Sequence, residues 1–171
     1  MRAKRIIAAL MLLAAACFGA RAQERKDDGG VPTVAYCDLL RDPASYDQKV
    51  IRVKVMYMSA FEGSSMYDLA CERKDSWVVF DKEVETSTDR KLLKKFRRLS
   101  DASPVKTRKG IDHPVRIVEV VWVGMFQTVK RTPIPGTHLY INGFGHLNGY
   151  DYQFNVRRIE QVNKLPASAP R

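Results

Sequence analysis

The residues best suited to chemistry form a basic run between Arg90 and Arg116. This run contains ten lysines and arginines and only two acidic residues, Asp101 and Asp112. A dense array of cations binds the phosphates of nucleic acids or other polyanions, and neighbouring aromatic side chains can stack on unpaired bases. The simpler interpretation is a solvated helix face, so polyanion binding stands as an alternative function. Its possible contacts are Lys94, Lys95, Arg97, Arg98, Lys106, Arg108 and Lys109.

Glu62, Asp68 and His146 could carry acid–base chemistry if the fold brought them together. A hydrolase needs such groups within hydrogen-bonding reach of one another and of the substrate. Loop and turn roles are the simpler interpretation, because the three residues are widely separated in the sequence. The sequence lacks nucleophile elbows, phosphate loops and the metalloprotease helix motif, and its three histidines show no ligand spacing. We therefore predict no catalytic residue, no metal site and no cofactor, with a hydrolase as a further alternative.

The N-terminal residues 1–22 are predicted to be a secretory signal peptide. Basic residues precede an apolar run of 11 residues, Ile6 to Ala16, and a small-x-small cleavage site ends at Ala22. The run is too short to span a bilayer, which requires about 20 apolar residues. The alternative is a lipoprotein acylated at Cys17. We expect a soluble exported protein, periplasmic or secreted, with no transmembrane segment and a formal charge reduced from +10 to +6.

Removal of the signal peptide leaves two cysteines, Cys37 and Cys71. In an oxidising compartment such a pair predicts a disulfide, whereas two buried thiols are the alternative. A bond between them closes a loop that contributes about 3–4 kcal/mol on the chain-entropy argument.

The elements around these residues are mostly strands. A flexible lead-in over residues 23–33 precedes a short helix, capped by Thr33 and ending near Arg41. The segment from Val50 to Met58 alternates clearly: its odd-numbered residues are apolar, and Arg52 and Lys54 point the other way. Further strands are predicted at 66–67, 77–80, 115–126, 139–141 and from 152, with a bend or bulge at Gly124 and a second bulge in the last strand.

An insertion over residues 86–114 interrupts the strands. Its first part predicts a helix from Asp89 to Leu99, capped by Ser87 or Thr88, with an apolar stripe on one side. Residues 100–114 are predicted to be a mobile loop, and residues 164–171 a disordered tail. The whole pattern is mainly β and predicts a small closed barrel of five to six strands, since closure removes exposed strand edges.

The segment Asp42-Pro-Ala-Ser-Tyr-Asp-Gln-Lys-Val-Ile-Arg-Val-Lys-Val55 is similar to the opening of OB-fold-like domains in exported bacterial proteins. Three further stretches and the residues before Cys71 resemble signatures of small exported proteins of unassigned function. The resemblance covers roughly Val34 to Val162 apart from the inserted helix, and it departs from the pattern at Gln48 and Val55. It implies an OB-fold-like barrel over residues 34–163. The further stretches begin at Cys37, Phe61 and Gly145, and Tyr67-Asp68 precedes Cys71.

The function that we expect is non-enzymatic: an exported module that binds a ligand or a protein partner at the cell envelope. Outside the cytoplasm, anionic cell-surface polymers and lipid head groups are better candidates for a polyanion than nucleic acid. The residues that could form a ligand site are Tyr57, Phe61, Glu62, Tyr67, Asp68, Trp77 and His146.

Overall fold

The computed structural model describes residues 30–71 and 74–165. The predicted signal peptide, Cys17 within it and residues 166–171 of the predicted tail lie outside these ranges. None of the helices within them is long and apolar enough to cross a membrane.

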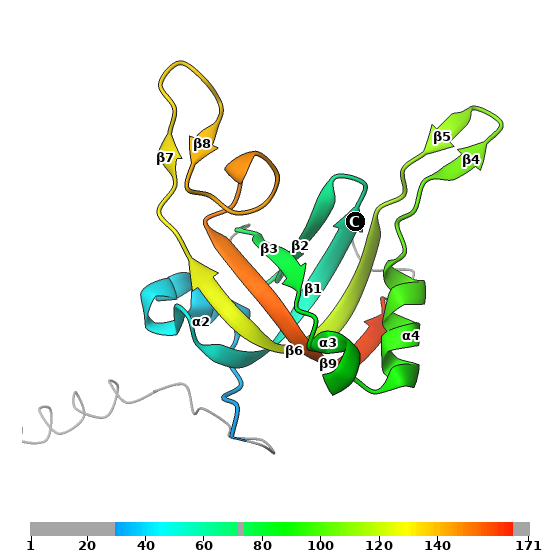
Figure 1. Ribbon diagram of the computed structural model, residues 1–171, viewed down its shortest axis with the longest axis horizontal. Coiled ribbons are helices and arrows are strands. Elements are labelled where there is room, and N and C mark those ends of the chain that lie inside the picture. The colour runs from blue at the N-terminus through cyan, green and yellow to red at the C-terminus, as the bar shows by residue number, and fades with distance from the viewer. Residues whose placement is uncertain (1–29, 72–73, 166–171) are drawn as a thin grey trace, which may run out of the picture.

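Five strands close into a barrel, in the order β1-β2-β3-β9-β6 (Figure 1). The pairing of β3 with β9 is parallel, and every other barrel pairing is antiparallel. This order, with the helices α3 and α4 between the third and fourth barrel strands, is that of an OB fold. The predicted mainly β, OB-fold-like barrel is therefore confirmed. The strands are β1 Val50–Ala60, β2 Gly63–Tyr67, β3 Ser76–Phe80, β6 Arg116–Thr128 and β9 Tyr152–Lys164.

The barrel interior is filled by the alternate residues of its strands. The odd-numbered residues of β1 from Ile51 to Tyr57 are all buried, as their alternation predicts. Tyr57 contacts the rings of Phe80, Phe96 and Trp122, with centroids 5.1–5.9 Å apart. Because Phe96 belongs to α4 (Arg90–Ser100), this helix packs its apolar side onto the aromatic cluster in the barrel core.

Two register shifts bend the pairing of β6 with β9, one of them between Val123 and Gly124. A side chain on Gly124 would come within 2.3 Å of the carbonyl oxygen of Asn155, so only glycine fits there. The predicted bulges at Gly124 and in the last strand are confirmed. They let both long strands curve around the barrel.

The helix α2 (Tyr36–Arg41) begins later than predicted, and Thr33 does not cap it. Thr33 instead forms a parallel bridge with Arg52, where residues 31–34 continue the edge of β1 that β2 leaves open. Part of the predicted lead-in is therefore hydrogen-bonded to the barrel. Arg52 lies beneath it and is only 7% exposed, paired with Glu160 rather than solvated.

A disulfide joins Cys37 in α2 to Cys71 after β2. The same region is held by the hydroxyl of Tyr36, which lies 2.8 Å from both the carbonyl oxygen of Lys74 and the hydroxyl of Ser76. Burial raises the pKa of Tyr36 far above its ordinary value. These contacts fasten α2 to the β2–β3 connection.

Two predictions about the insertion are wrong in detail. The cap of α4 is Asp89, whose carboxylate accepts hydrogen bonds from the backbone N–H groups of Lys91 and Leu92. Thr88 instead accepts a hydrogen bond from the backbone N–H of Ile159 in β9. Residues 100–114 are also not a plain loop, because they contain a hairpin of β4 (Val105–Thr107) and β5 (Gly110–Asp112).

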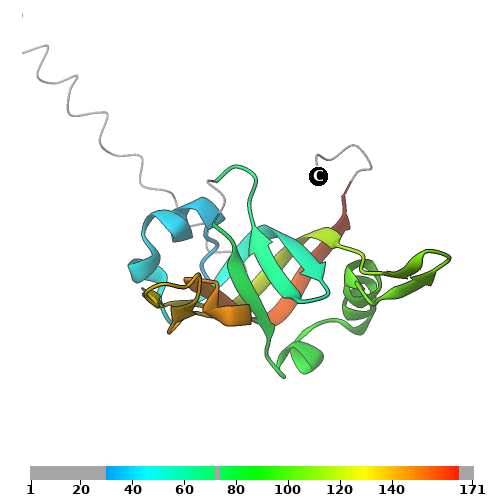
Figure 2. The same cartoon turned by 90° about the horizontal axis from the view of Figure 1, so that it is seen from above.

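The β6–β9 connection contains a second small hairpin outside the barrel. Its strands are β7 (Thr132–Pro133) and β8 (Tyr140–Ile141), followed by the 3₁₀ helix η3 (His146–Asn148). The strand predicted at 139–141 therefore exists but does not belong to the barrel. The β7–β8 hairpin lies across the barrel from α4 and the β4–β5 hairpin (Figures 1 and 2).

Candidate functional site

The helix α4 presents a surface made only of cations. Its 11 residues include six lysines and arginines and no acidic residue. At 100° per residue, these six fall on one broad arc, opposite the stripe that contains Leu93 and Phe96. All six are exposed, and they are Arg90, Lys91, Lys94, Lys95, Arg97 and Arg98.

The spacing of these cations does not stabilise the helix. Arg90 and Lys94, Lys91 and Lys95, and Lys94 and Arg98 are like-charge neighbours at i,i+4, each unfavourable by about 0.2–0.5 kcal/mol. A helix face selected only for solvation and stability normally mixes charges of both signs. The arrangement therefore concentrates positive potential at the expense of helix stability.

Two of the six cations have partners within the described ranges. The ammonium of Lys95 donates to the carbonyl oxygen of Val162, and Arg97 pairs with Glu85. The other four form no hydrogen bond or ion pair through their side chains with residues that the structure describes. Their charge is available to an external anion.

The β4–β5 hairpin continues this cationic surface. Lys106, Arg108 and Lys109 lie in its exposed strands and turn. The hairpin follows α4 directly in the chain and projects from the same side of the barrel (Figures 1 and 2). The six cations of α4 and these three cations of the hairpin are called the basic edge below. It includes all seven of the predicted polyanion contacts.

The face that OB folds commonly use for ligands is covered by this chain itself. Such folds bind oligonucleotides and oligosaccharides over their second and third strands and the adjoining loops. Here Trp77 of β3 points outward on that face, and its ring lies 5.3 Å from the ring of Tyr150. Side chains on Gly63 and Gly145 would collide with Trp77 at 2.2 and 2.5 Å. The β6–β9 connection therefore packs on the place where a ligand would stack.

Several predicted ligand residues have other roles or no common site. The prediction that Tyr57 belongs to a ligand site is wrong, because its side chain is 5% exposed in the barrel core and cannot stack on a ligand. Burial raises its pKa. Tyr67 is half-buried at the end of β2, whereas Phe61 is 63% exposed and its ring contacts the tilted ring of His113, with centroids 4.3 Å apart.

The predicted acid–base residues are not brought together. Glu62 precedes β2 and Asp68 follows it, so they lie at opposite ends of a strand, roughly 20 Å apart at about 3.3 Å per residue. Asp68 accepts a hydrogen bond from the backbone N–H of Ala70, a turn role. His146 is exposed in η3, within the connection that covers Trp77. Glu62, Asp68 and His146 thus form no catalytic group.

Within the described residues, Cys37, Asp68 and Cys71 form a group close enough to hold a metal ion. Both sulfur atoms belong to the disulfide, however, and so neither can act as a thiolate ligand. The group does not fit a metal in this oxidised form.

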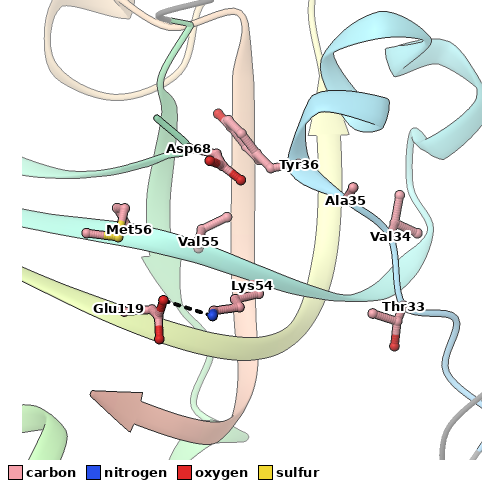
Figure 3. Close-up of a pocket in the computed structure, with 9 residues that line it drawn as sticks. All are labelled: Thr33, Val34, Ala35, Tyr36, Lys54, Val55, Met56, Asp68 and Glu119. Atoms are coloured by element: carbon pink, nitrogen blue, oxygen red, sulfur yellow. Dashed lines mark ion pairs between the residues drawn. The ribbon is translucent and has the colours of Figure 1, made fainter. Parts of the chain in front are cut away.

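A shallow cavity of about 420 Å³ lies between residues 33–36 and β1 (Figure 3). Lys54 of β1 and Glu119 of the neighbouring strand β6 pair at 2.9 Å on one wall of it, and Glu119 also accepts a hydrogen bond from Asn163. The contacts with Asn163 and Lys54 lower the pKa of Glu119. Lys54 and Glu119 satisfy each other and Asp68 accepts from the backbone N–H of Ala70, so this cavity offers fewer available charges than the basic edge.

Arg90 and Lys91 were not among the predicted polyanion contacts, although they complete the cationic face of α4. The i,i+4 spacing from Arg90 to Lys94 and from Lys91 to Lys95 indicates that they lie on the same helix face as the predicted contacts. The hairpin itself carries no such signal, because its short strands lack an apolar alternation.

No protein-family model and no curated protein sequence matches this chain. Among solved structures, the chain is similar to one described as "a putative aspartyl-tRNA synthetase from Leishmania major Friedlin", with a TM-score of 0.43 and 13% sequence identity. The match covers 98% of this chain and 28% of the other, so the chain spans about a quarter of that protein's length. A likeness this distant assigns neither a ligand nor an activity, and the OB-fold-like class depends on the strand order and pairing.

Proposed function

We propose that this protein is a non-enzymatic binding module that holds polyanions on its basic edge. The observation that carries the proposal is the face of α4, where six exposed cations include three like-charge i,i+4 pairs and no acidic residue. A bound anion would relieve this repulsion. Anion binding therefore explains the arrangement of the cations, whereas a requirement for solvation alone does not.

The proposal places the protein outside the cytoplasm, at the cell envelope. The Cys37–Cys71 disulfide supports an oxidising compartment. The expected anions are therefore cell-surface polymers or lipid head groups. The covered β2–β3 face supports a site on the basic edge rather than at Trp77.

Heparin chromatography of the full chain tests the proposal. Lys94 and Arg98 are the cations to change, because their side chains have no partner among the described residues. We expect Lys94→Glu/Arg98→Glu to elute at lower salt, with the slope of log affinity against log salt reduced by about 1 for each cation removed.

The matched control is Lys49→Glu/Lys130→Glu, which changes the net charge equally. Both control residues are exposed, and they lie near the ends of β1 and β6 that are remote from the β4–β5 hairpin. Equal losses for the two double variants would indicate a response to net charge alone and would overturn the proposal. Unchanged elution of Lys94→Glu/Arg98→Glu would overturn it as well.

A further inference from the structure

The β4–β5 hairpin presents an exposed aliphatic side chain among its cations. Ile111 is 68% exposed, the largest exposed fraction of any large hydrophobic residue in the described ranges. All residues of both strands are exposed, and the hairpin projects beyond the barrel (Figures 1 and 2). A single exposed aliphatic side chain is common on a protein surface, but this one stands on a projecting hairpin beside Lys106, so a partner would meet apolar and cationic surface together.

The two faces of the hairpin differ in charge. Lys106 pairs directly with Ile111, so these two side chains share one face. Asp112 is the next residue along β5 and points to the opposite face. The turn between the strands carries Arg108 and Lys109. Ile111 is therefore accompanied by cations, and the acidic residue of the hairpin lies on the other face.

We propose that this face docks on the anionic surface of a phospholipid bilayer. Ile111 enters the boundary between head groups and acyl chains, and Lys106, Arg108 and Lys109 bind lipid phosphates. The inference rests on the proposed polyanion-binding function and names its partner. A lipid interface accepts apolar side chains and attracts cations at the same place, which a dissolved polymer does not.

The composition of the hairpin favours lipid over nucleic acid or glycan. Residues 105–112 themselves contain no aromatic side chain on which a base or a sugar ring could stack, and the ring of Phe61 at the base of the hairpin already lies against His113. Either polymer would engage the cations and leave Ile111 in water. At the base of the hairpin, Phe61 adds another apolar side chain, 63% exposed against His113. The cations of α4 extend the attraction to a negative surface.

Cosedimentation of the full chain with vesicles tests the inference. We expect binding to vesicles of equal parts phosphatidylglycerol and phosphatidylcholine, and none to phosphatidylcholine alone. Ile111→Ser should weaken this binding about tenfold, as expected for the loss of one buried aliphatic side chain. The matched control is Leu147→Ser, since Leu147 is 61% exposed but lies in η3 on the covered β2–β3 face.

A gain-of-signal variant gives a second readout. The tryptophan in Ile111→Trp should shift its fluorescence to the blue on anionic vesicles, whereas that in Leu147→Trp should not. The inference is overturned if Ile111→Ser binds vesicles like the unchanged protein, or if both tryptophans behave alike. Heparin retention without vesicle binding overturns this inference and leaves the proposed function standing, whereas loss of both overturns both.

Discussion

The indole ring of Trp77 occupies the space that a side chain on Gly145 would need. A Cβ at Gly145 would lie 2.5 Å from the ring, and one at Gly63 would meet the far end of the same ring at 2.2 Å. Trp77 is thus held between Gly63 at the start of β2 and Gly145 in the β6–β9 connection. This packing fastens the β6–β9 connection onto the outside of the barrel.

Gly145→Ala should therefore destabilise the protein more than Gly136→Ala. Both glycines have a positive φ, 68° and 74°, which disfavours alanine at either position, and the ψ of −158° at Gly145 adds to this cost because that region is nearly confined to glycine. Only Gly145 faces Trp77, and displacing this ring adds about 1–3 kcal/mol. Urea unfolding measures both losses. Equal losses would contradict the packing, and a double-mutant cycle with Trp77→Leu should remove the part of the excess that comes from contact with the ring.

The pair of Arg52 and Glu160 should stabilise the barrel in a pH-dependent way. Burial acts to raise the pKa of Glu160, but hydrogen bonds from Arg52 and Arg158 outweigh it and hold this pKa below the ordinary range. A lowered carboxyl pKa adds stability above the unfolded pKa, near 4.3, and this stability is lost as the pH falls through the folded-state pKa.

Glu160→Gln should therefore lower the free energy of unfolding by about 1.5–3 kcal/mol near neutral pH. The difference in the free energy of unfolding between Glu160→Gln and the unchanged protein should vanish in acid, where Glu160 is protonated. The control is Glu85→Gln, whose pair with Arg97 is exposed and should contribute less than about 1 kcal/mol. A gap that stays constant from neutral pH to about pH 3 would argue against the ionised pair.

The disulfide should protect both of its cysteines from alkylation. In denaturant, peptides containing Cys37 and Cys71 should carry iodoacetamide only after reduction. Cys37→Ala/Cys71→Ala should lower the free energy of unfolding by about 3–4 kcal/mol, as should reduction of the unchanged protein. Peptide mass spectrometry and urea titration make these measurements, and alkylation of either peptide before reduction would rule out the bond.

Lys94→Glu should separate binding from stability in α4. Lys94 has like-charge i,i+4 interactions with Arg90 and Arg98. A glutamate at this position makes both interactions attractive, each contributing about 0.2–0.5 kcal/mol. We therefore expect unfolding in urea at equal or higher denaturant, together with weaker heparin retention. A loss of both stability and retention would mean that Lys94 has a structural role.

The alternation of β1 predicted its buried side correctly because a period of two residues is a local property of a strand. The same alternation already placed Tyr57 inward with Ile51, Val53 and Val55. Its assignment to a ligand site came from residue type alone and was wrong. The cap of α4 shows the opposite case. Thr88 and Asp89 are both residue types that cap helices. Asp89 is the cap because the hydroxyl of Thr88 accepts a hydrogen bond from the backbone N–H of Ile159 in β9.

The amino-acid sequence was enough to predict the barrel strands, a bend or bulge at Gly124, the cysteine pair and the cations of α4. These features follow from periodicity, from glycine sterics and from residue type, all of which act over a few neighbouring residues. Packing between distant segments, in contrast, places Trp77 between Gly63 and Gly145 and leaves Glu62 and Asp68 at opposite ends of β2. Such relationships depend on where long connections return to the barrel, and that is set by packing between segments distant in the chain.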